Sequence, residues 1–439
     1  MIVTTALAVT AALAALQPSA GADARTSLRL DGFFDLAVDE AHGHVYVSQD
    51  RGSSELVVLD LKGEPVGVIA GMGGARGLVL SEDATRLYVG LSDDHAIAEI
   101  DTSTLEVVAE HPLPSWTTGS QTMPSCPQDL VRVGRLVVFG DYCPNKFSAI
   151  RIFDPATADV PVTHPGSGSG RLVFSAAHGI LVALIGGYDI SSFDVEADPV
   201  AIVDRGDTSV LNQTTDLAVI PGTDRLVVES GLVLDMRDLS VVGAYDGSPV
   251  NAPTQPEPET VVAREDGVVA FGLHRYSPAG DVRVYSTTTH LMRDHAFVST
   301  DDPIFQDEEL SFRRRSLEFG EEVLYGIEFA DRGSEARFWA IRPREDTVLR
   351  VTTRKKRYAR GERVTVDVRA AGPLQSRRGI AWIERWDRND QVSGRVPYRL
   401  DRSGHAVVRF ALRVKSTIHV TLNDGGDLVV SAKIIGFRR

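Results

Sequence analysis

Short apolar runs recur in pairs along this chain, and a short polar turn separates the two runs of each pair. The second runs lie roughly 42 to 55 residues apart and begin at Val45, Leu87, Leu136, Ile180, Leu226, Val268 and Val323. No segment with helical periodicity lies between them. A strand-only repeat of this length predicts the four-stranded blades of a β-propeller. We count seven repeats; six or eight are the alternatives, because the last two repeats are degenerate.

The second repeat shows the expected strand chemistry most clearly. Strands are predicted at residues 77–80, 86–90, 95–101 and 105–110, where β-branched residues alternate with polar ones between Asp- and Gly-rich turns. An aspartate is expected to close the third strand of later repeats, at Asp154, Asp194 and Asp235. The seventh repeat lacks a fourth strand of its own, and we predict that residues 27–30 supply it, because a closed propeller leaves no exposed edge.

Residues 77–90, an apolar run followed by a turn and Leu-Tyr-Val, resemble the YVTN-type propeller repeats of bacterial surface and periplasmic proteins. The resemblance covers roughly residues 30–343. It implies the fold, and it implies little about activity, because one scaffold serves many functions.

Residues 345–439 form a second all-β unit in the sequence pattern. Seven short alternating strands are expected at residues 348–352, 363–369, 380–384, 395–400, 406–412, 417–422 and 428–434. This density of strands suits an immunoglobulin-like β-sandwich. Residues 404–407 and 424–427 also resemble Ig-like modules on secreted actinobacterial propeller–Ig proteins, a group without an assigned activity. The expected fold is therefore all-β: a seven-bladed β-propeller at 25–343, followed by an Ig-like β-sandwich at 345–439.

The N-terminal segment predicts export. Residues 3–16 are apolar, and Ala22, Asp23 and Ala24 fit an A-x-A cleavage site, so residues 1–24 are interpreted as a signal peptide. No Lys or Arg precedes the apolar run, and an ordinary buried helix is the alternative. The segment is too short for a membrane span, and no other apolar span is present, so no transmembrane segment is expected. A secreted, extracellular location follows. Association with the cell wall is the alternative.

Charge is divided unequally along the chain. The whole sequence carries −14, whereas residues 345–439 carry about +11 and the remainder about −25. The densest basic patch consists of Arg354, Lys355, Lys356 and Arg357. One interpretation is that it meets an anionic cell-wall polymer or another surface protein. The alternative is a solvated face, or a face that docks on the acidic propeller. Nucleic acid is an unsuitable partner for an exported protein without aromatic residues in this patch, and we expect a monomer.

The two cysteines, Cys126 and Cys143, lie in the third repeat. An even pair in an exported protein predicts a disulfide. Cys126 precedes one predicted strand and Cys143 follows the next, so an antiparallel hairpin would bring them together. The residues around both cysteines also resemble a recurrent blade of the actinobacterial propeller–Ig proteins.

Candidate ligand-binding residues stand just before the innermost strands, where loops converge on the channel mouth. They are Asp35, Arg76, Asp129, Arg171, Asp216, Glu259 and Arg315. One interpretation is a polar funnel for a small polar ligand or a cation. The other is a set of mutually paired charges at the top of a water-filled channel.

The sequence offers no motif for a catalytic residue, a cofactor or a metal. HExxH, EF-hand and G-x-S-x-G patterns are absent. His42 and His178 are expected at one rim in different blades, and His42 with His44 could bind a metal adventitiously. The acidic residues at 301–302 and 307–309 suit either calcium or a solvated loop. We therefore favour a non-enzymatic exported binding or scaffold protein. The alternative is a lactonase-like hydrolase or a lyase acting on a small substrate at the channel mouth.

Overall fold

The computed structural model describes residues 24–437 with internal gaps. The gaps are residue 51 and residues 144–147, 167–169, 186–188, 198–199, 209–215, 246–257, 265–266, 274–280, 287–291, 298–309, 331–334, 343–347, 354–356, 359–362, 372–377, 386–391, 412–415 and 425–426. The expected signal peptide up to residue 23 and the acidic loop at 301–302 and 307–309 lie outside the described residues.

The described residues form an all-β fold without helices, in which antiparallel sheets of four strands follow one another along the chain. The first sheet contains β2 (Asp35–Asp39), β3 (His44–Ser48), β4 (Glu55–Asp60) and β5 (Pro65–Ala70). The second contains β6 (Ala75–Leu80), β7 (Arg86–Leu91), β8 (Ala96–Asp101) and β9 (Glu106–Pro112). The third contains β12 (Pro127–Val133), β13 (Leu136–Tyr142), β14 (Ser148–Asp154) and β15 (Asp159–Pro165), and a hairpin of β10 (Trp116–Thr118) and β11 (Gln121–Met123) precedes it.

The later sheets repeat this order. The fourth contains β16 (Leu172–Ser175), β17 (Ile180–Ile185), β18 (Asp189–Ala197) and β19 (Val200–Thr208). The fifth contains β20 (Leu217–Val219), β21 (Arg225–Val228), β22 (Leu232–Asp235) and β23 (Val241–Ala244). The sixth contains β24 (Pro258–Arg264), β25 (Val268–Leu273), β26 (Asp281–Ser286) and β27 (Met292–Phe297), and the seventh contains β28 (Leu310–Phe319), β29 (Leu324–Ala330), β30 (Glu335–Ile341) and β1 (Ala24–Arg29).

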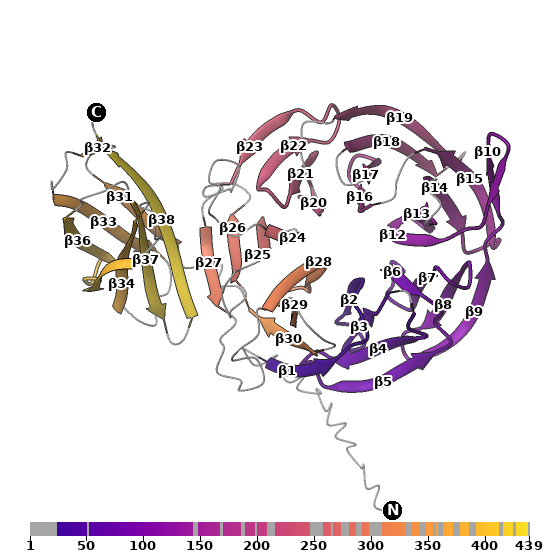
Figure 1. Ribbon diagram of the computed structural model, residues 1–439, viewed down its shortest axis with the longest axis horizontal. Coiled ribbons are helices and arrows are strands. Elements are labelled where there is room, and N and C mark those ends of the chain that lie inside the picture. Colours follow the sequence, from indigo (N-terminus) through magenta and orange to yellow (C-terminus); the bar gives the residue numbers. More distant parts are fainter. Residues whose placement is uncertain are drawn as a thin grey trace, which may run out of the picture.

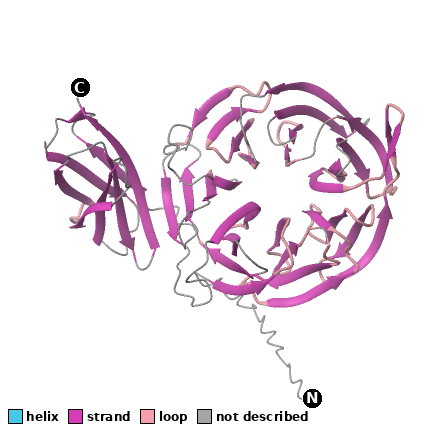
Figure 2. Cartoon of the chain, in the orientation of Figure 1, coloured by secondary structure: helices cyan, strands magenta, loops and turns pink. Residues whose placement is uncertain are grey.

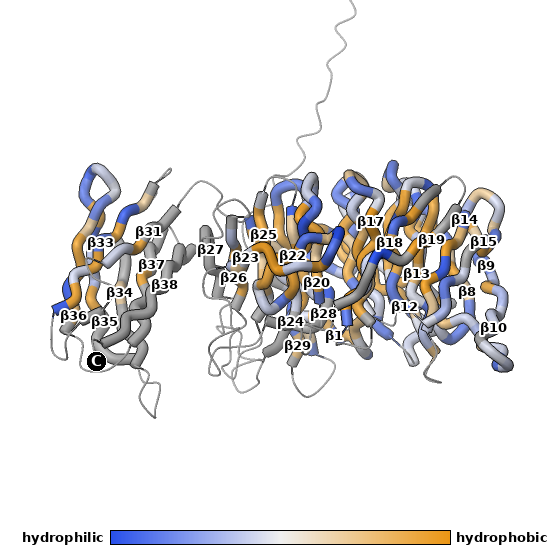
Figure 3. The backbone as a smooth tube through the Cα atoms, turned by 90° about the horizontal axis from the view of Figure 1, so that it is seen from above, coloured by the Kyte–Doolittle hydropathy of each residue, from blue (hydrophilic) through white to orange (hydrophobic). Residues whose placement is uncertain are grey.

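These sheets are arranged like blades around a central axis, with β2, β6, β12, β16, β20, β24 and β28 nearest to it (Figure 1). Where the segments between strands are described, short loops and turns join them (Figure 2). The second strands β3, β7 and β13 are almost entirely buried, because neighbouring sheets cover both of their faces. The outer strands β5, β9 and β23 are largely exposed. Seen from the side, apolar residues fill the strands and polar residues gather at the turns (Figure 3).

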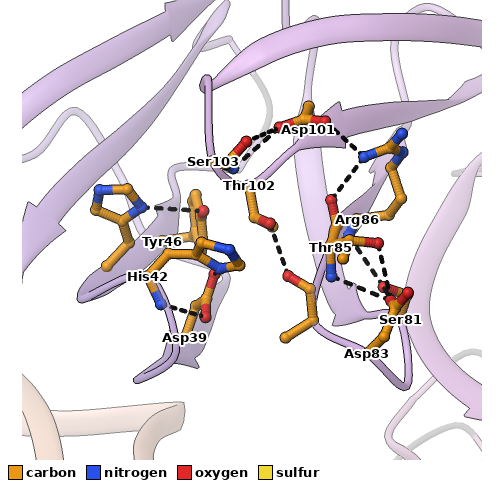
Figure 4. A network of polar contacts seen from close by, with 12 residues as sticks. Asp39, His42, Tyr46, Ser81, Asp83, Thr85, Arg86, Asp101, Thr102 and Ser103 are labelled. Atoms are coloured by element: carbon orange, nitrogen blue, oxygen red, sulfur yellow. Dashed lines mark hydrogen bonds and ion pairs between the residues drawn. The ribbon is translucent and has the colours of Figure 1, made fainter.

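Aspartate-based turns explain the regular return of Asp in the sequence. The carboxylate of Asp101 at the end of β8 accepts the N–H groups of Ser103 and Thr104 at 3.0 and 3.1 Å (Figure 4). Asp60, Asp154 and Asp235 make the same type of turn. A carboxylate that captures nearby backbone N–H groups favours a tight turn after a strand. Asp194 is an exception to the prediction, since it lies inside β18 and pairs with Arg205 on β19 at 2.7 Å.

The seventh sheet is completed by the N-terminal strand, as predicted from the sequence. β1 pairs antiparallel with β30, and Leu28 stands opposite Ala336. Leu28 and Leu30 are buried with Phe33 and Phe338 in one apolar cluster that joins the first and seventh sheets. The start and the end of the repeat region are therefore held together by both strand pairing and packing.

The third sheet contains the predicted disulfide. Cys126 and Cys143 are bonded, and their Cα atoms lie 5.2 Å apart. The same region is held by a buried ion pair between Asp141 and Arg151, at 3.0 Å. Asp141 also accepts the N–H of Cys126 at 2.7 Å and the hydroxyl of Ser125 at 2.6 Å.

The C-terminal strands form two sheets around one core. β31 (Val348–Thr353), β33 (Arg363–Ala371) and β36 (His405–Ala411) make a three-stranded sheet. The other sheet has the order β38 (Asp427–Phe437), β37 (Ser416–Asp424), β34 (Arg378–Arg385) and β35 (Val392–Arg399), and β32 (Arg357–Tyr358) pairs with β38. Val366, Phe410, Ala381 and Val420 share one apolar cluster, so the two sheets pack face to face. β38 also pairs with β27 of the sixth sheet. Within the described residues, no helix has the length and apolar character of a membrane span.

Candidate functional site

The inner strands of the seven sheets share one equivalent position. It holds a buried Leu or Val in each strand: Leu36, Leu78, Leu130, Leu172, Leu217, Val261 and Leu317. The residues immediately before these seven are Asp35, Gly77, Asp129, Arg171, Asp216, Thr260 and Ser316. We call this set the entry layer. It mixes carboxylates, a guanidinium and small residues around one axis.

The three aspartates of the entry layer connect neighbouring sheets. Each accepts a backbone N–H from the next sheet along the chain. Asp35 accepts the N–H of Leu78, Asp129 that of Leu172 and Asp216 that of Val261. Asp216 also accepts the hydroxyl of Thr260 at 2.7 Å. Each aspartate thus satisfies an N–H at the start of a strand, where the inner edge of the sheet has no partner strand.

Two arginines cross the channel between these carboxylates. Nη2 of Arg315 lies 2.9 Å from Oδ2 of Asp129, and Nη1 lies 3.7 Å from Oδ2 of Asp35. Nε of Arg171 lies 3.3 Å from Oδ1 of Asp216, and Nη1 lies 4.0 Å from Oδ1 of Asp129. Carboxylates and guanidiniums therefore alternate in the order Asp35, Arg315, Asp129, Arg171, Asp216. This arrangement places each buried guanidinium between two carboxylates of opposite charge.

Arg315 adopts an unusual backbone conformation to reach this position. Its φ is +62°, and the pairing of β28 with β29 shifts register between Phe312 and Leu317. A left-handed residue at a bulge redirects its side chain, at an energetic cost that the surrounding contacts must offset. Its guanidinium carbon lies 4.7 Å from the ring centroid of Phe34, and that of Arg76 lies 4.8 Å from the same centroid.

The structure brings together most of the residues predicted for the channel mouth. Asp35, Asp129, Arg171, Asp216 and Arg315 converge as described above. Arg76 lies beside them, stacked on Phe34 and paired with Asp50 at 2.5 Å, and Gly77 takes its place in the entry layer. Glu259 lies in β24, but its side chain is outside the described residues.

A cavity of about 850 Å³ extends from the entry layer along the inner strands. Asp35 and Arg171 line it at the entry layer, and Arg132, Arg264 and Glu321 line it near the far ends of the strands. Most of the wall between them is aliphatic, with Phe174 and Phe319 as its aromatic members. Its volume falls in the range of small-molecule sites.

One acidic residue interrupts the aliphatic wall, and the sequence analysis missed it. Two residues after the entry layer, the inner strands carry Ala37, Val79, Val131, Val173, Ala218, Val262 and Glu318, all of which line the cavity. Glu318 is the one charged member of this set. Aligning the seven inner strands by position would have revealed it, whereas inspection of the residues just before the strands could not.

Burial and like charges shift the protonation of two carboxyls in the cavity. Burial raises the pKa of Glu318 to about 7; Arg171 opposes the shift, and Asp35 and Asp216 add to it. Burial likewise raises the pKa of Asp35 to about 6, against the attraction of Arg315 and Arg171 and with the repulsion of Asp129. Burial acts against the charge on Arg171, but the surrounding carboxylates outweigh it and raise its pKa.

The histidines considered from the sequence lie away from this layer and have local partners. Nδ1 of His42 lies 2.8 Å from Asp39, and Nδ1 of His178 lies 3.2 Å from the hydroxyl of Ser175. His44 contacts Tyr46. Within the part of the chain that the structure describes, no three His, Cys, Asp or Glu side chains gather as a metal-binding group would require.

The comparisons with known proteins leave the family open. No protein-family model matches this chain, and no curated protein matches it. The fold and the channel define an all-β protein of small antiparallel four-stranded sheets, consistent with propeller blades.

Proposed function

We propose that this chain is an exported, non-catalytic binding protein: a seven-bladed β-propeller of the YVTN type whose channel receives a small ligand. A basic immunoglobulin-like sandwich accompanies the propeller and orients it at the cell surface or in the medium. The single observation that supports a binding channel is that paired carboxylates and guanidiniums of the entry layer lie at one end of a cavity of about 850 Å³. Asp129 and Asp216 form ion pairs with guanidiniums and accept backbone N–H groups, so they are held rigidly at this end of the cavity.

Strand order supports the finer description of both units. β1 joins β30 as a closing strand would, and the C-terminal unit packs a three-stranded against a four-stranded sheet, as Ig-like sandwiches do. The basic patch would then meet an anionic cell-wall polymer or another surface protein. The pairing of β38 with β27 favours the alternative in which the sandwich also docks on its own propeller.

The binding function is tested by filling the channel. A panel of small molecules is screened for those that raise the melting temperature of the full chain. Val131→Trp places a large ring in the cavity wall and is expected to abolish the shift. Val107→Trp is the matched control, because Val107 is 42% exposed on an outer strand. Binding elsewhere, or the absence of any stabilising compound, contradicts the proposal.

A second function, hydrolase or lyase, is favoured by one observation. Glu318 has a pKa of about 7 and lines the cavity, and carboxyls near neutrality serve as general acids or bases. An ester or lactone panel would test it. Turnover by the wild-type chain that Glu318→Gln lowers at least about a hundredfold would replace the binding proposal with an enzymatic one.

A further inference from the structure

At the place where the aliphatic wall of the channel begins, carboxyls outnumber guanidiniums, whereas Arg132, Arg264 and Glu321 line the cavity near the far ends of the strands. Four carboxyls act on one another there, those of Asp35, Asp129, Asp216 and Glu318, and two guanidiniums accompany them. Arg315 lies between Asp35 and Asp129, and Arg171 lies between Asp129 and Asp216. Asp35 and Glu318 both line the cavity. Glu318 makes none of the hydrogen bonds or ion pairs found among the described residues, although Arg171 is close enough to influence it.

We propose that the cavity binds an organic cation with an apolar body, whose ammonium or guanidinium head lies against Glu318 and Asp35. This inference rests on the proposed binding function, since it specifies the ligand class of the same channel. Small aliphatic residues, including Ala37, Val79 and Val173, would surround the body of the ligand. A charged head in a buried site requires an opposite charge, and Glu318 supplies it with Asp35 beside it.

The protonation of the two carboxyls is consistent with this assignment. Burial and neighbouring carboxylates hold the pKa of Glu318 near 7 and that of Asp35 near 6 in the protein without ligand. A cation beside them favours their ionised forms, so binding releases protons around neutral pH. The cation should therefore bind more tightly at pH 8 than at pH 5. The acidic charge of the repeat region, about −25, would attract cations toward the channel.

A metal ion fits this site less well than an organic cation. Hard cations need several convergent oxygen ligands, but guanidiniums separate Asp35, Asp129 and Asp216. The aliphatic wall offers no oxygen ligands and suits the body of an organic molecule.

The test uses the full chain and four probes at pH 8: hexylamine, hexanol, hexanoate and calcium chloride. Isothermal titration gives the affinities, and methyl NMR shifts of Val79, Val131 and Val173 locate the binding. Hexylammonium is expected to bind roughly tenfold more tightly than hexanol, and hexanoate to bind more weakly still. Its affinity should fall roughly tenfold at pH 5. Glu318→Gln should remove most of the advantage over hexanol, whereas Glu106→Gln, on the exposed face of β9, should keep it.

The outcomes separate the inference from the proposed function. If hexanol or hexanoate binds in the channel as well as hexylamine, or if only calcium binds, the cation assignment is wrong and the binding function stands. If none of the probes moves the channel methyl signals, the assignment fails, and the screen with Val131→Trp decides the binding function independently. Glu318→Gln removes a buried charge without changing side-chain size, so the variant should fold. If it fails to fold, Glu318 is structural and the assignment is overturned.

Discussion

Nη2 of Arg315 lies 2.9 Å from Oδ2 of Asp129, although the two residues belong to the seventh and third sheets. Both side chains are almost fully buried, and Asp129 also accepts the N–H of Leu172 from the fourth sheet. This one carboxylate therefore connects three sheets across the channel. Because the contact joins distant parts of the chain, we expect it to form only when the ring of sheets has assembled.

The first prediction concerns the charge of Asp129. Asp129→Asn keeps an acceptor for the N–H of Leu172 but leaves Arg315 and Arg171 with less compensating charge in a buried layer. We expect the free energy of unfolding to fall by about 2–4 kcal/mol, as measured by urea denaturation. Asp159→Asn makes the same change on the exposed face of β15 and should have little effect. Equal midpoints for the two variants would show that the layer contributes no specific stability.

The second prediction concerns the N-terminal strand. Leu28 on β1 is 6% exposed and packs in the cluster that joins the first and seventh sheets. Leu28→Ala should lower the free energy of unfolding by about 2–4 kcal/mol, because it removes buried methyl groups and leaves a cavity. Arg29→Ala changes the next, exposed residue of the same strand and serves as the control. A stability loss confined to Arg29→Ala would contradict the observed orientation of β1.

The strand pattern was predictable because each sheet is built from local signals. The turn after β8 begins at Asp101, which accepts the backbone N–H groups of Ser103 and Thr104, two and three residues further along the chain. The pairing of residues 27–29 with β30 followed from counting strands in the seventh repeat, although Leu30, also predicted to pair, lies beyond the end of β1. Asp194 misled the prediction because β18 and β19 are long, nine residues each, and the strand runs past this aspartate. Strand length there depends on pairing with β19, which a local pattern does not contain.

The site was predictable in outline, but Arg76, Glu259 and Arg315 each lie one residue before the equivalent position of their strand. Asp35, Asp129, Arg171, Asp216 and Arg315 were found because charged residues precede apolar strands. Register between sheets could not be deduced from one strand alone, so Arg76 was chosen where Gly77 occupies the equivalent position. A side chain is unfavourable at that position, since a Cβ on Gly77 would lie 2.5 Å from the carbonyl oxygen of Gln128.

The third prediction concerns the disulfide. Replacing Cys126 and Cys143 by Ala opens a loop with a sequence separation of 17 residues, and the chain-entropy model gives a loss of ~3 kcal/mol. The hydrogen bonds of Asp141 to Ser125 and to the backbone N–H of residue 126 remain, so the variant should still fold. Urea denaturation measures the loss, and the wild-type chain in reductant should match the variant. Two reactive thiols in the unreduced, unfolded protein would disprove the bond.

The fourth prediction concerns the basic patch. Arg357 begins β32, whereas Arg354, Lys355 and Lys356 lie outside the described residues. If the patch attaches the protein to anionic cell walls, binding of the full chain should weaken as salt rises, because attraction is screened over ~8 Å at physiological ionic strength. Changing the four residues to Gln should reduce binding, whereas Lys62→Gln in a turn of the first sheet should not. Binding that is insensitive to salt would leave the patch as a solvated or docking face.

The fifth prediction concerns stability against pH. Burial raises the pKa of Glu318 from its ordinary value of 4.5 to about 7, so the folded protein holds this proton more tightly than the unfolded chain. The resulting stabilisation is complete below pH 4.5 and is lost as the pH rises through about 7. Glu318→Gln removes this dependence. The free energy of unfolding of the variant should therefore rise relative to that of the wild type. The rise should be on the order of 3 kcal/mol between pH 4.5 and a pH above 7. Urea denaturation at several pH values provides the measurement, with Glu106→Gln as the exposed control, and a difference that stays constant with pH would show that Glu318 titrates normally.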